Sequence, residues 1–284
     1  MLPATAVRTV PLWSGEAVPV LGQGTWGMAE GKRPREEELR ALRTGIELGM
    51  TLIDTAEMYA DGGAEELVGD AIKGRRRDEV FIVSKVLPQH AARNGTIAAC
   101  ERSLRRLKTH VIDLYLLHWR EQIPLQETLD GFDELVKLGK IRYWGVSNFD
   151  VNDMEELIQL AGGDPVTTDQ VLYNLTRRGI ESDLLPWCHL RKIPIMAYSP
   201  IEQGRMLSHP VLEKIARRHG AMPAQVALAW VVVHDGVIAI PRAGVSGHVR
   251  ENRAALDLRL TQQDLAELDR AFSPPDGPQP LEML

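Results

Sequence analysis

Short apolar runs alternate with helix-like segments along most of this chain, and this alternation restricts the possible folds more than any other feature. The runs are rich in β-branched residues, and the segments between them place apolar residues three and four positions apart. We expect eight strands, at 21–26, 51–54, 80–85, 112–118, 141–147, 167–171, 194–199 and 236–241. We expect eight helices, at 35–49, 63–74, 94–108, 125–139, 151–161, 181–192, 209–219 and 247–254.

This order of elements predicts a (β/α)8 TIM barrel. Strands that alternate with helices form right-handed βαβ units around a parallel sheet, and the reactive groups of such a barrel lie at the C-terminal ends of its strands. Two segments lie outside the repeat. Residues 9–22 predict a β-hairpin that turns at Ser14-Gly15 and covers the barrel bottom. An extra C-terminal helix begins after the N-cap Thr261 and precedes an irregular Pro-rich end. We expect a single domain over residues 1–284.

Composition restricts the environment and the partners. Hydrophobic residues make up 44% of the chain and charged residues 25%, as in a globular protein with a substantial core. The net charge of -6 does not suggest nucleic-acid binding. No apolar run approaches the roughly 20 residues of a membrane span, and MLPATAVRTV shows no secretory signal, so we expect a cytoplasmic protein. Cys100 and Cys188 show no paired spacing, which predicts free thiols and no metal site.

Gly22, Gly24 and Gly27 match the G-x-G-x-x-G pattern of dinucleotide-binding folds. That motif must end a strand and open a helix at once. Here the residues MAEGKRP intervene before any helix. We therefore interpret these glycines as turn and close-approach positions at a strand end.

Four reactive side chains stand at or just after neighbouring strand ends. Asp54, Lys85 and His118 end the second, third and fourth expected strands, and Tyr59 follows in the loop after the second. Alone, such an Asp is usually a turn former, such a Lys is usually solvated and such a His is usually a core residue. Because strand ends converge at the mouth of a barrel, the four side chains taken together predict a catalytic site.

The chemistry of this group fits proton donation to a carbonyl. A free tyrosine has a pKa of about 10, and an ammonium about 4 Å away supplies enough energy to lower it by about 3 units. We expect Lys85 to lower the pKa of Tyr59 in this way, and Asp54 to keep Lys85 charged against the cost of burial. His118 then orients the substrate oxygen. No side chain here supplies a hydride, so a cofactor must.

The sequence resembles the aldo-keto reductase family over essentially its whole length. The blocks GQGTWGM, LIDTAEMYADGGAEELVG, VFIVSKV, IDLYLLHW, IRYWGVSNF, IMAYSPIEQG and IPRAGVSGHVREN look like those of the family and occur in its order. The resemblance implies a barrel that binds NADPH across its mouth. It also implies a catalytic tetrad at Asp54, Tyr59, Lys85 and His118.

The same resemblance implies a set of cofactor-binding residues. Ser147, Asn148 and Gln170 match positions that hold the carboxamide, and Tyr198 matches the aromatic residue on which the nicotinamide stacks. Ser199 and Ile201 match pyrophosphate-loop and packing positions. The run that begins at Ile240 is similar to the family's adenosine-binding segment.

This adenosine-binding segment departs from the family pattern. Arg242, Ala243 and His248 stand where NADP-binding members commonly carry a lysine, a serine and an arginine, whereas Glu251 and Asn252 are retained. Arg242 can bind a 2'-phosphate bidentately, and His248 is a weaker partner. We expect NADPH in preference to NADH, with the degree of discrimination left open.

Trp26 and Trp119 follow strand ends and are expected to line the substrate pocket. Aromatic walls and short connections favour small aldehydes and ketones, including dicarbonyls such as methylglyoxal. The alternative is a nucleotide-dependent regulatory or redox-sensing module, because fold alone does not determine function. No dimer motif is evident, so we expect a monomer.

Overall fold

The computed structural model describes residues 7–284, apart from the side chain of Arg75. The expected single domain includes residues 1–6, and the expected absence of a secretory signal concerns the same stretch, so for these residues both predictions lie outside the described part of the chain. Eight parallel strands form one sheet in the order β3 to β10. Isolated parallel bridges join Leu21 to Ala239 and Gly24 to Arg242, so the two edges of the sheet meet. The predicted (β/α)8 barrel is confirmed.

The barrel strands coincide with the predicted apolar runs, and several are shorter. They are β3 (Gln23–Gly24), β4 (Leu52–Asp54), β5 (Phe81–Val86), β6 (Ile112–Leu117), β7 (Ile141–Ser147), β8 (Asp169–Leu172), β9 (Ile195–Tyr198) and β10 (Val237–Ala239). Strand β3, the first of the barrel, is short, and the backbone around it lies very close to β4 and to the residues after β10. A Cβ on Gly22 would lie 2.7 Å from a methyl group of Leu52, and one on Gly24 would lie 2.6 Å from the Ile240 oxygen. The close-approach interpretation is confirmed for Gly22 and Gly24, whereas Gly27 has φ of +75° and is a turn position.

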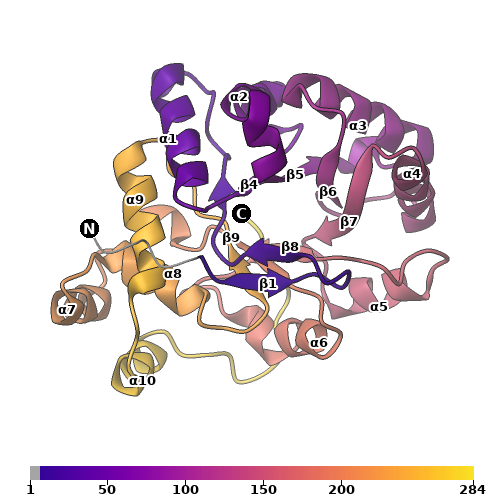
Figure 1. Cartoon of the computed structure of the whole chain (residues 1–284). Helices are drawn as coiled ribbons and strands as arrows, with labels where there is room; N and C mark the ends of the chain where they lie inside the picture. Colours follow the sequence, from indigo (N-terminus) through magenta and orange to yellow (C-terminus); the bar gives the residue numbers. More distant parts are fainter. Residues whose placement is uncertain (1–6) are drawn as a thin grey trace.

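The helices surround the strands on the outside of the barrel (Figure 1). In the described part of the chain they are α1 (Arg35–Glu47), α2 (Gly63–Ala71), α3 (Arg93–Leu107), α4 (Leu125–Lys137), α5 (Val151–Gln159), α6 (Leu184–Leu190), α7 (Pro210–His219), α8 (Pro223–Val231), α9 (Ser246–Ala254) and α10 (Gln262–Ala271). Short 3-10 turns also occur, of which η1 (Tyr59–Gly62), η4 (Gly179–Ser182) and η5 (Glu202–Gly204) bear on the site.

Helix α8 is absent from the sequence prediction, which places a single helix, at 209–219, between the last two strands. Its residues Val226, Ala227, Leu228, Trp230 and Val231 are all buried. A helix that is apolar around its whole circumference shows no helical periodicity, so its pattern could not be recognised. Helix α8 packs against β10 and α9. The predicted helix, α7, packs against α8 and α10 at the periphery (Figure 1).

The predicted helix at 181–192 is also wrong at its start. The backbone of Asp183 has φ of −147° and ψ of −63°, which ends η4 and separates it from α6. The Asp183 carboxylate then accepts a hydrogen bond from the Leu184 amide. The aspartate therefore begins a new helix here.

The N-terminal hairpin is confirmed and covers the bottom of the barrel. Strand β1 (Thr9–Pro11) pairs antiparallel with β2 (Ala17–Pro19), and Gly15 in the turn has φ of +86°. The Trp13 indole donates to the Thr167 hydroxyl, 3.1 Å away, just before β8 begins. Arg142, near the start of β7, binds Glu16 at 3.0 Å. These contacts join the hairpin to the N-terminal ends of the strands.

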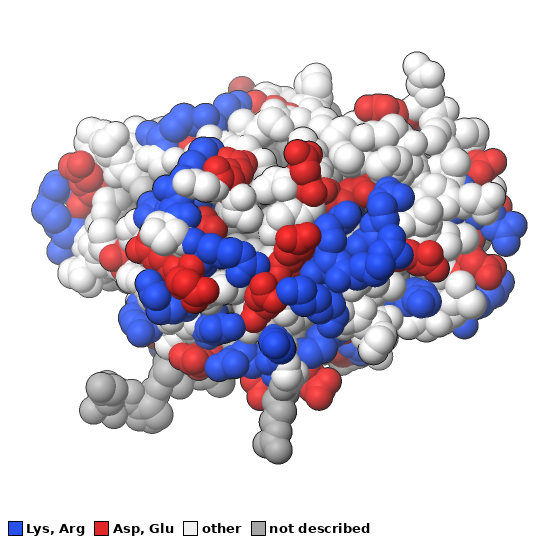
Figure 2. All heavy atoms as spheres, turned by 90° about the horizontal axis from the view of Figure 1, so that it is seen from above, with Lys and Arg blue, Asp and Glu red and all other residues white. Residues whose placement is uncertain are grey.

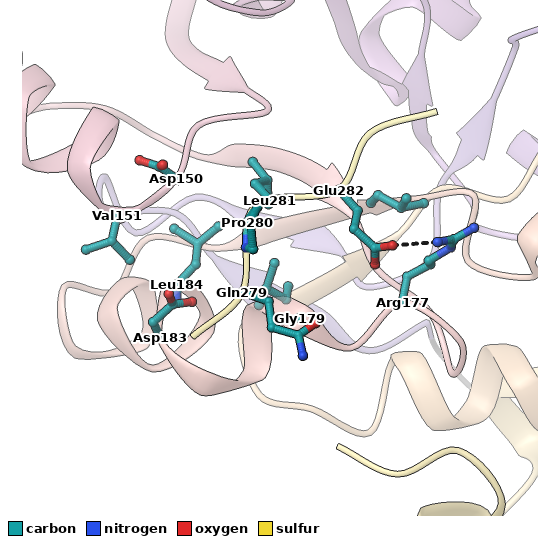
Figure 3. Close-up of a pocket in the computed structure, with 12 residues that line it drawn as sticks. Asp150, Val151, Arg177, Gly179, Asp183, Leu184, Gln279, Pro280, Leu281 and Glu282 are labelled. Atoms are coloured by element: carbon teal, nitrogen blue, oxygen red, sulfur yellow. Dashed lines mark hydrogen bonds and ion pairs between the residues drawn. The ribbon is translucent and has the colours of Figure 1, made fainter. Parts of the chain in front are cut away.

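The C-terminal helix and tail also agree with the sequence. Thr261 caps α10, and its hydroxyl accepts from the Asp264 amide at 3.2 Å. The chain beyond α10 contains no regular element and crosses over the loop after β8. There the carboxylate of Glu282 in the tail lies 2.5 Å from the Arg177 guanidinium (Figure 3).

The surface mixes charges of both signs. Figure 2 views the molecule of Figure 1 from above, and basic and acidic side chains are interleaved on this face. Arg35 pairs with Asp70 at 2.6 Å, and Arg106 pairs with the buried Glu65 at 2.6 Å.

Among residues 7–284, no helix combines the length and apolar character that a bilayer crossing requires. Cys100 and Cys188 are buried free thiols, as predicted.

Candidate active site

The barrel brings the four predicted catalytic residues together at the C-terminal ends of β4, β5 and β6. Asp54 is the last residue of β4, Lys85 lies near the end of β5, and His118 directly follows β6. Tyr59 begins η1 after β4. Because β4 and β5 are neighbours in parallel register, with Asp54 opposite Val83, the side chains of all three strands converge.

Lys85 is the centre of this cluster and is fully buried. Its Nζ lies 2.8 and 2.9 Å from the two carboxylate oxygens of Asp54 and 2.8 Å from the Thr55 carbonyl oxygen. It also lies 3.2 Å from the Tyr59 hydroxyl. Burial lowers the pKa of Lys85, and the neighbouring Asp54 carboxylate opposes this shift. The predicted pairing of Asp54 with Lys85 is thus present.

The sequence-based prediction for the pKa of Tyr59 is not met. Burial, followed by the charge of Asp54, raises this pKa well above its ordinary value. The expected lowering assumed that the ammonium of Lys85 outweighs the burial of the phenol. In the structure Asp54 neutralises that charge, and the phenol loses solvation as well. Tyr59 is therefore a firmly protonated donor.

His118 is a neutral imidazole in this site. Burial, followed by the charge of Lys85, lowers its pKa to about 2. Its buried Nδ1 has no hydrogen-bond partner among the described residues. Its ring centre lies 5.9 Å from that of Tyr59, in an edge-to-face arrangement. A neutral imidazole beside a protonated phenol can direct two hydrogen bonds at one oxygen atom.

The predicted carboxamide-binding residues lie next to this cluster and are connected to it. The side-chain amide of Gln170 donates to Asp54 at 2.8 Å, and the Ser147 hydroxyl donates to the main-chain carbonyl of Gln170 at 2.7 Å. The side-chain Nδ2 of Asn148 donates to the main-chain carbonyl of His118 at 3.1 Å, and its Oδ1 accepts from the Tyr198 hydroxyl at 2.9 Å. Burial raises the pKa of Tyr198 to about 12. One hydrogen-bonded network therefore runs from β4 to β9 across the mouth.

The loop after β9 carries Ser199 and Ile201 and has an unusual backbone. Ser199, Glu202 and Gln203 have φ of +46°, +49° and +55°, a region that costs energy for residues other than glycine. The buried Glu202 carboxylate stabilises this conformation by accepting from Asn174 at 2.8 Å and from Arg205 at 2.7 Å. Asn174 and Glu202 were not predicted, because side chains that meet from separate loops leave no pattern in sequence.

Arg177 connects this loop to the C-terminal tail. Its guanidinium lies 3.3 Å from Glu202 and also contacts Glu282 of the tail. Figure 3 shows Glu282 directed at Arg177, and Gln279, Pro280 and Leu281 beside η4 and the starts of α5 and α6. The tail therefore returns to the rim of the barrel mouth and adds a wall that the short connections do not provide.

The predicted adenosine-binding residues cluster around the end of β10 and α9. Ile240 and Asn252 are buried, Glu251 is half-buried and His248 is exposed. Arg242 donates to the Gly27 carbonyl at 3.1 Å and lies 4.0 Å from Glu38. Helix α9 begins at Ser246, so its free amides face the same region.

The two predicted substrate-pocket tryptophans occupy different environments. The ring of Trp119 lies 4.9 Å from that of His118, and its indole donates to Glu121 at 3.0 Å. Trp26 is 54% exposed just beyond β3. Trp119 is therefore beside the cluster, and Trp26 presents an exposed ring at the C-terminal end of β3.

Comparison with known proteins finds a family model and several relatives that match this chain. Residues 20–272 match the model of the Aldo/keto reductase family. The chain is 52% identical over 278 residues to methylglyoxal reductase YeaE of Escherichia coli (strain K12), across 96% of this chain and 98% of that protein. It is 36% identical to glyoxal reductase of Bacillus subtilis (strain 168), across the full length of both.

A solved structure agrees with these sequence matches. The aldo-keto reductase from Klebsiella pneumoniae, crystallised in complex with NADPH, superposes with a TM-score of 0.95 at 51% identity. The match covers 99% of this chain and 100% of that one.

Proposed function

The chain belongs to the aldo/keto reductase family, and from this premise we propose that it reduces small aldehydes and ketones to alcohols with NADPH. We include dicarbonyls such as methylglyoxal among its substrates, because the YeaE and Bacillus relatives bear the names methylglyoxal and glyoxal reductase. The observation that carries the proposal is the contact of Lys85 with both Asp54 and Tyr59, beside a neutral His118.

The residues present suit the cofactor that this function requires. Ser147, Asn148 and Gln170 offer hydroxyl and amide groups of the kind that bind a carboxamide, and Tyr198 offers a ring for stacking. Arg242 and the start of α9 offer a cation and free amides for phosphate. The buried, unpartnered Nδ1 of His118 marks a polar region that is incomplete without a ligand. When bound, NADPH supplies the hydride.

The side chains then provide the proton and the orientation. His118 and Tyr59 both direct hydrogen bonds at the carbonyl oxygen, which polarises the carbonyl and fixes its position. As the carbon accepts the hydride, the oxygen becomes an alkoxide, and Tyr59 transfers its proton to that oxygen. An alkoxide is a much stronger base than a phenolate, so this transfer is favourable even from a phenol with a raised pKa. Lys85 stabilises the phenolate, and Asp54 keeps Lys85 charged.

Steady-state turnover tests the proposal. NADPH oxidation should be measured with methylglyoxal, glyoxal and a bulky aldehyde as substrates. We expect turnover with the small dicarbonyls and a lower kcat/KM for the bulky aldehyde. If the protein binds NADPH and turns over none of these substrates, the alternative of a nucleotide-sensing module replaces the reductase.

We also propose that the protein is a cytoplasmic monomer that folds as a single domain. These proposals rest on the sequence, which shows no dimer motif and no apolar run long enough to span a membrane. Sedimentation of the purified chain, cell fractionation and a single cooperative unfolding transition are the corresponding tests.

A further inference from the structure

Two arginines from loops distant in sequence meet over the backbone of Gly244. A Cβ on Gly244 would lie 3.0 Å from Cδ and 3.2 Å from Nε of Arg33, in the loop between β3 and α1. The same point lies 3.6 Å from Nη2 of Arg242, which follows β10. The two arginine side chains therefore approach the same stretch of backbone at the barrel mouth, and the absence of a side chain at residue 244 gives Arg33 the room to pack there.

The charges of this pair are only weakly balanced. Arg33 lies 3.9 Å from Glu37, and Arg242 lies 4.0 Å from Glu38, so both pairs are loose. Arg35, two residues beyond Arg33, makes a close pair with Asp70 at 2.6 Å. Two like charges side by side repel one another, and a bound anion removes that repulsion. Arg33 is 39% and Arg242 is 36% exposed, so an anion from solution can reach both.

The chemistry of two convergent guanidinium groups is that of a phosphate site. Each guanidinium presents a planar set of donors that matches two phosphate oxygens. The site lies next to the start of α9, whose residues Glu251 and Asn252 are assigned above to the adenosine half of the cofactor. A phosphate group on the adenosine, rather than the pyrophosphate, is therefore the anion within reach.

We propose that Arg33 is a specificity-determining residue that binds the 2'-phosphate of NADPH together with Arg242. This inference rests on the proposed function. It assigns the second cation of the phosphate site to the loop after β3, in addition to the residues that follow β10. Discrimination between NADPH and NADH then depends on two loops that Gly244 allows to come together.

Fluorescence titration with NADPH and NADH tests the assignment without turnover. For Arg33→Ala we expect the Kd for NADPH to rise roughly 10- to 100-fold, the range for loss of a charge-assisted hydrogen-bonded contact, and the Kd for NADH to stay unchanged. Arg33→Lys keeps the charge and loses the planar donors, so it should give an intermediate Kd. Arg35→Ala is the matched control and should bind both nucleotides as the wild type does.

Competition with adenosine nucleotides identifies which phosphate is bound. We expect 2',5'-ADP to bind the wild type more tightly than 5'-ADP does, and Arg33→Ala to remove that difference. Equal losses for NADPH and NADH in Arg33→Ala would overturn the inference, as would an unchanged NADPH to NADH ratio. If the wild type binds both dinucleotides equally, the inference fails and the proposed function stands. If it binds neither, both fail.

Discussion

The Nζ of Lys85 lies 3.2 Å from the hydroxyl of Tyr59, although 26 positions separate the two residues in the chain. Parallel pairing of β4 with β5 brings them together, and the hydrogen bond from the Thr55 amide to the Val83 carbonyl extends that pairing into the loop that leads to Tyr59. The contact joins a proton donor to the charge that stabilises its conjugate base. The same cation is paired with Asp54, so a change at any of the three should affect the other two.

Lys85→Met should lower both the reductase activity and the free energy of unfolding. The substitution leaves Asp54, which is 2% exposed, without its cation, and such a loss typically costs about 3–5 kcal/mol in the free energy of unfolding. Urea denaturation measures this cost. The double variant Asp54→Asn with Lys85→Met should regain much of the stability and none of the activity. A double variant that is no more stable than Lys85→Met would refute the buried ion pair.

The pH dependence of kcat should show no histidine titration. Free histidine titrates near pH 6.5, whereas the pKa of His118 is lowered to about 2, so His118 stays neutral over the whole working range. Lys85 has a lowered pKa and loses its charge at a lower pH than a free lysine. We therefore expect kcat to stay level as the pH passes through 6.5, and to fall on the alkaline side at a lower pH than that at which a free lysine titrates. A loss of activity on acidification through pH 6.5 would contradict a neutral His118.

Asp169 should make the protein less stable as the pH rises. This residue of β8 is fully buried, and neither carboxyl oxygen has a hydrogen-bond partner of good geometry among the described residues. Burial raises its pKa well above the ordinary value. The folded state therefore holds a proton that the unfolded state releases above about pH 4, and stability falls by up to about 1.4 kcal/mol per pH unit above that point.

Asp169→Asn removes this dependence. Urea denaturation at about pH 5 and pH 8 should show a larger stability gain over the wild type at the higher pH. The exposed Asp164→Asn serves as the control and should change little at either pH. Equal effects of Asp169→Asn at both pH values would show that the carboxyl group is already ionised in the folded protein.

Glu202→Gln should weaken NADPH binding more than it lowers kcat. The Glu202 carboxylate holds the loop after β9 through Asn174, Arg177 and Arg205, and that loop contains residues with positive φ. Loss of its charge removes charge-assisted bonds of about 1.5–3 kcal/mol, part of which should appear in the Kd for NADPH. Glu213→Gln on α7 is an exposed control. An unchanged Kd in Glu202→Gln would show that the loop keeps its conformation without this carboxylate.

The extent to which sequence predicts this molecule differs between strands and loops. Asp54, Lys85 and His118 could be grouped from sequence, because a barrel directs the ends of consecutive strands to one mouth. Helix α8 could not be recognised, since its burial on every side removes the periodic pattern of a surface helix. The direction of the Tyr59 pKa shift depends on burial and on the neutralising Asp54, neither of which sequence measures. Arg33 and Glu202 act through contacts between loops, whose conformations follow from packing of the whole chain.

Tyr59→Phe tests the central claim, that Tyr59 donates the proton, most directly. The variant removes one oxygen atom and leaves the ring and the surrounding network in place. With methylglyoxal as substrate and NADPH saturating, we predict that kcat falls by roughly 10²- to 10⁴-fold, as expected for loss of a general acid, while the Kd for NADPH is unchanged. A variant that binds NADPH normally and reduces methylglyoxal at the wild-type rate would contradict the account.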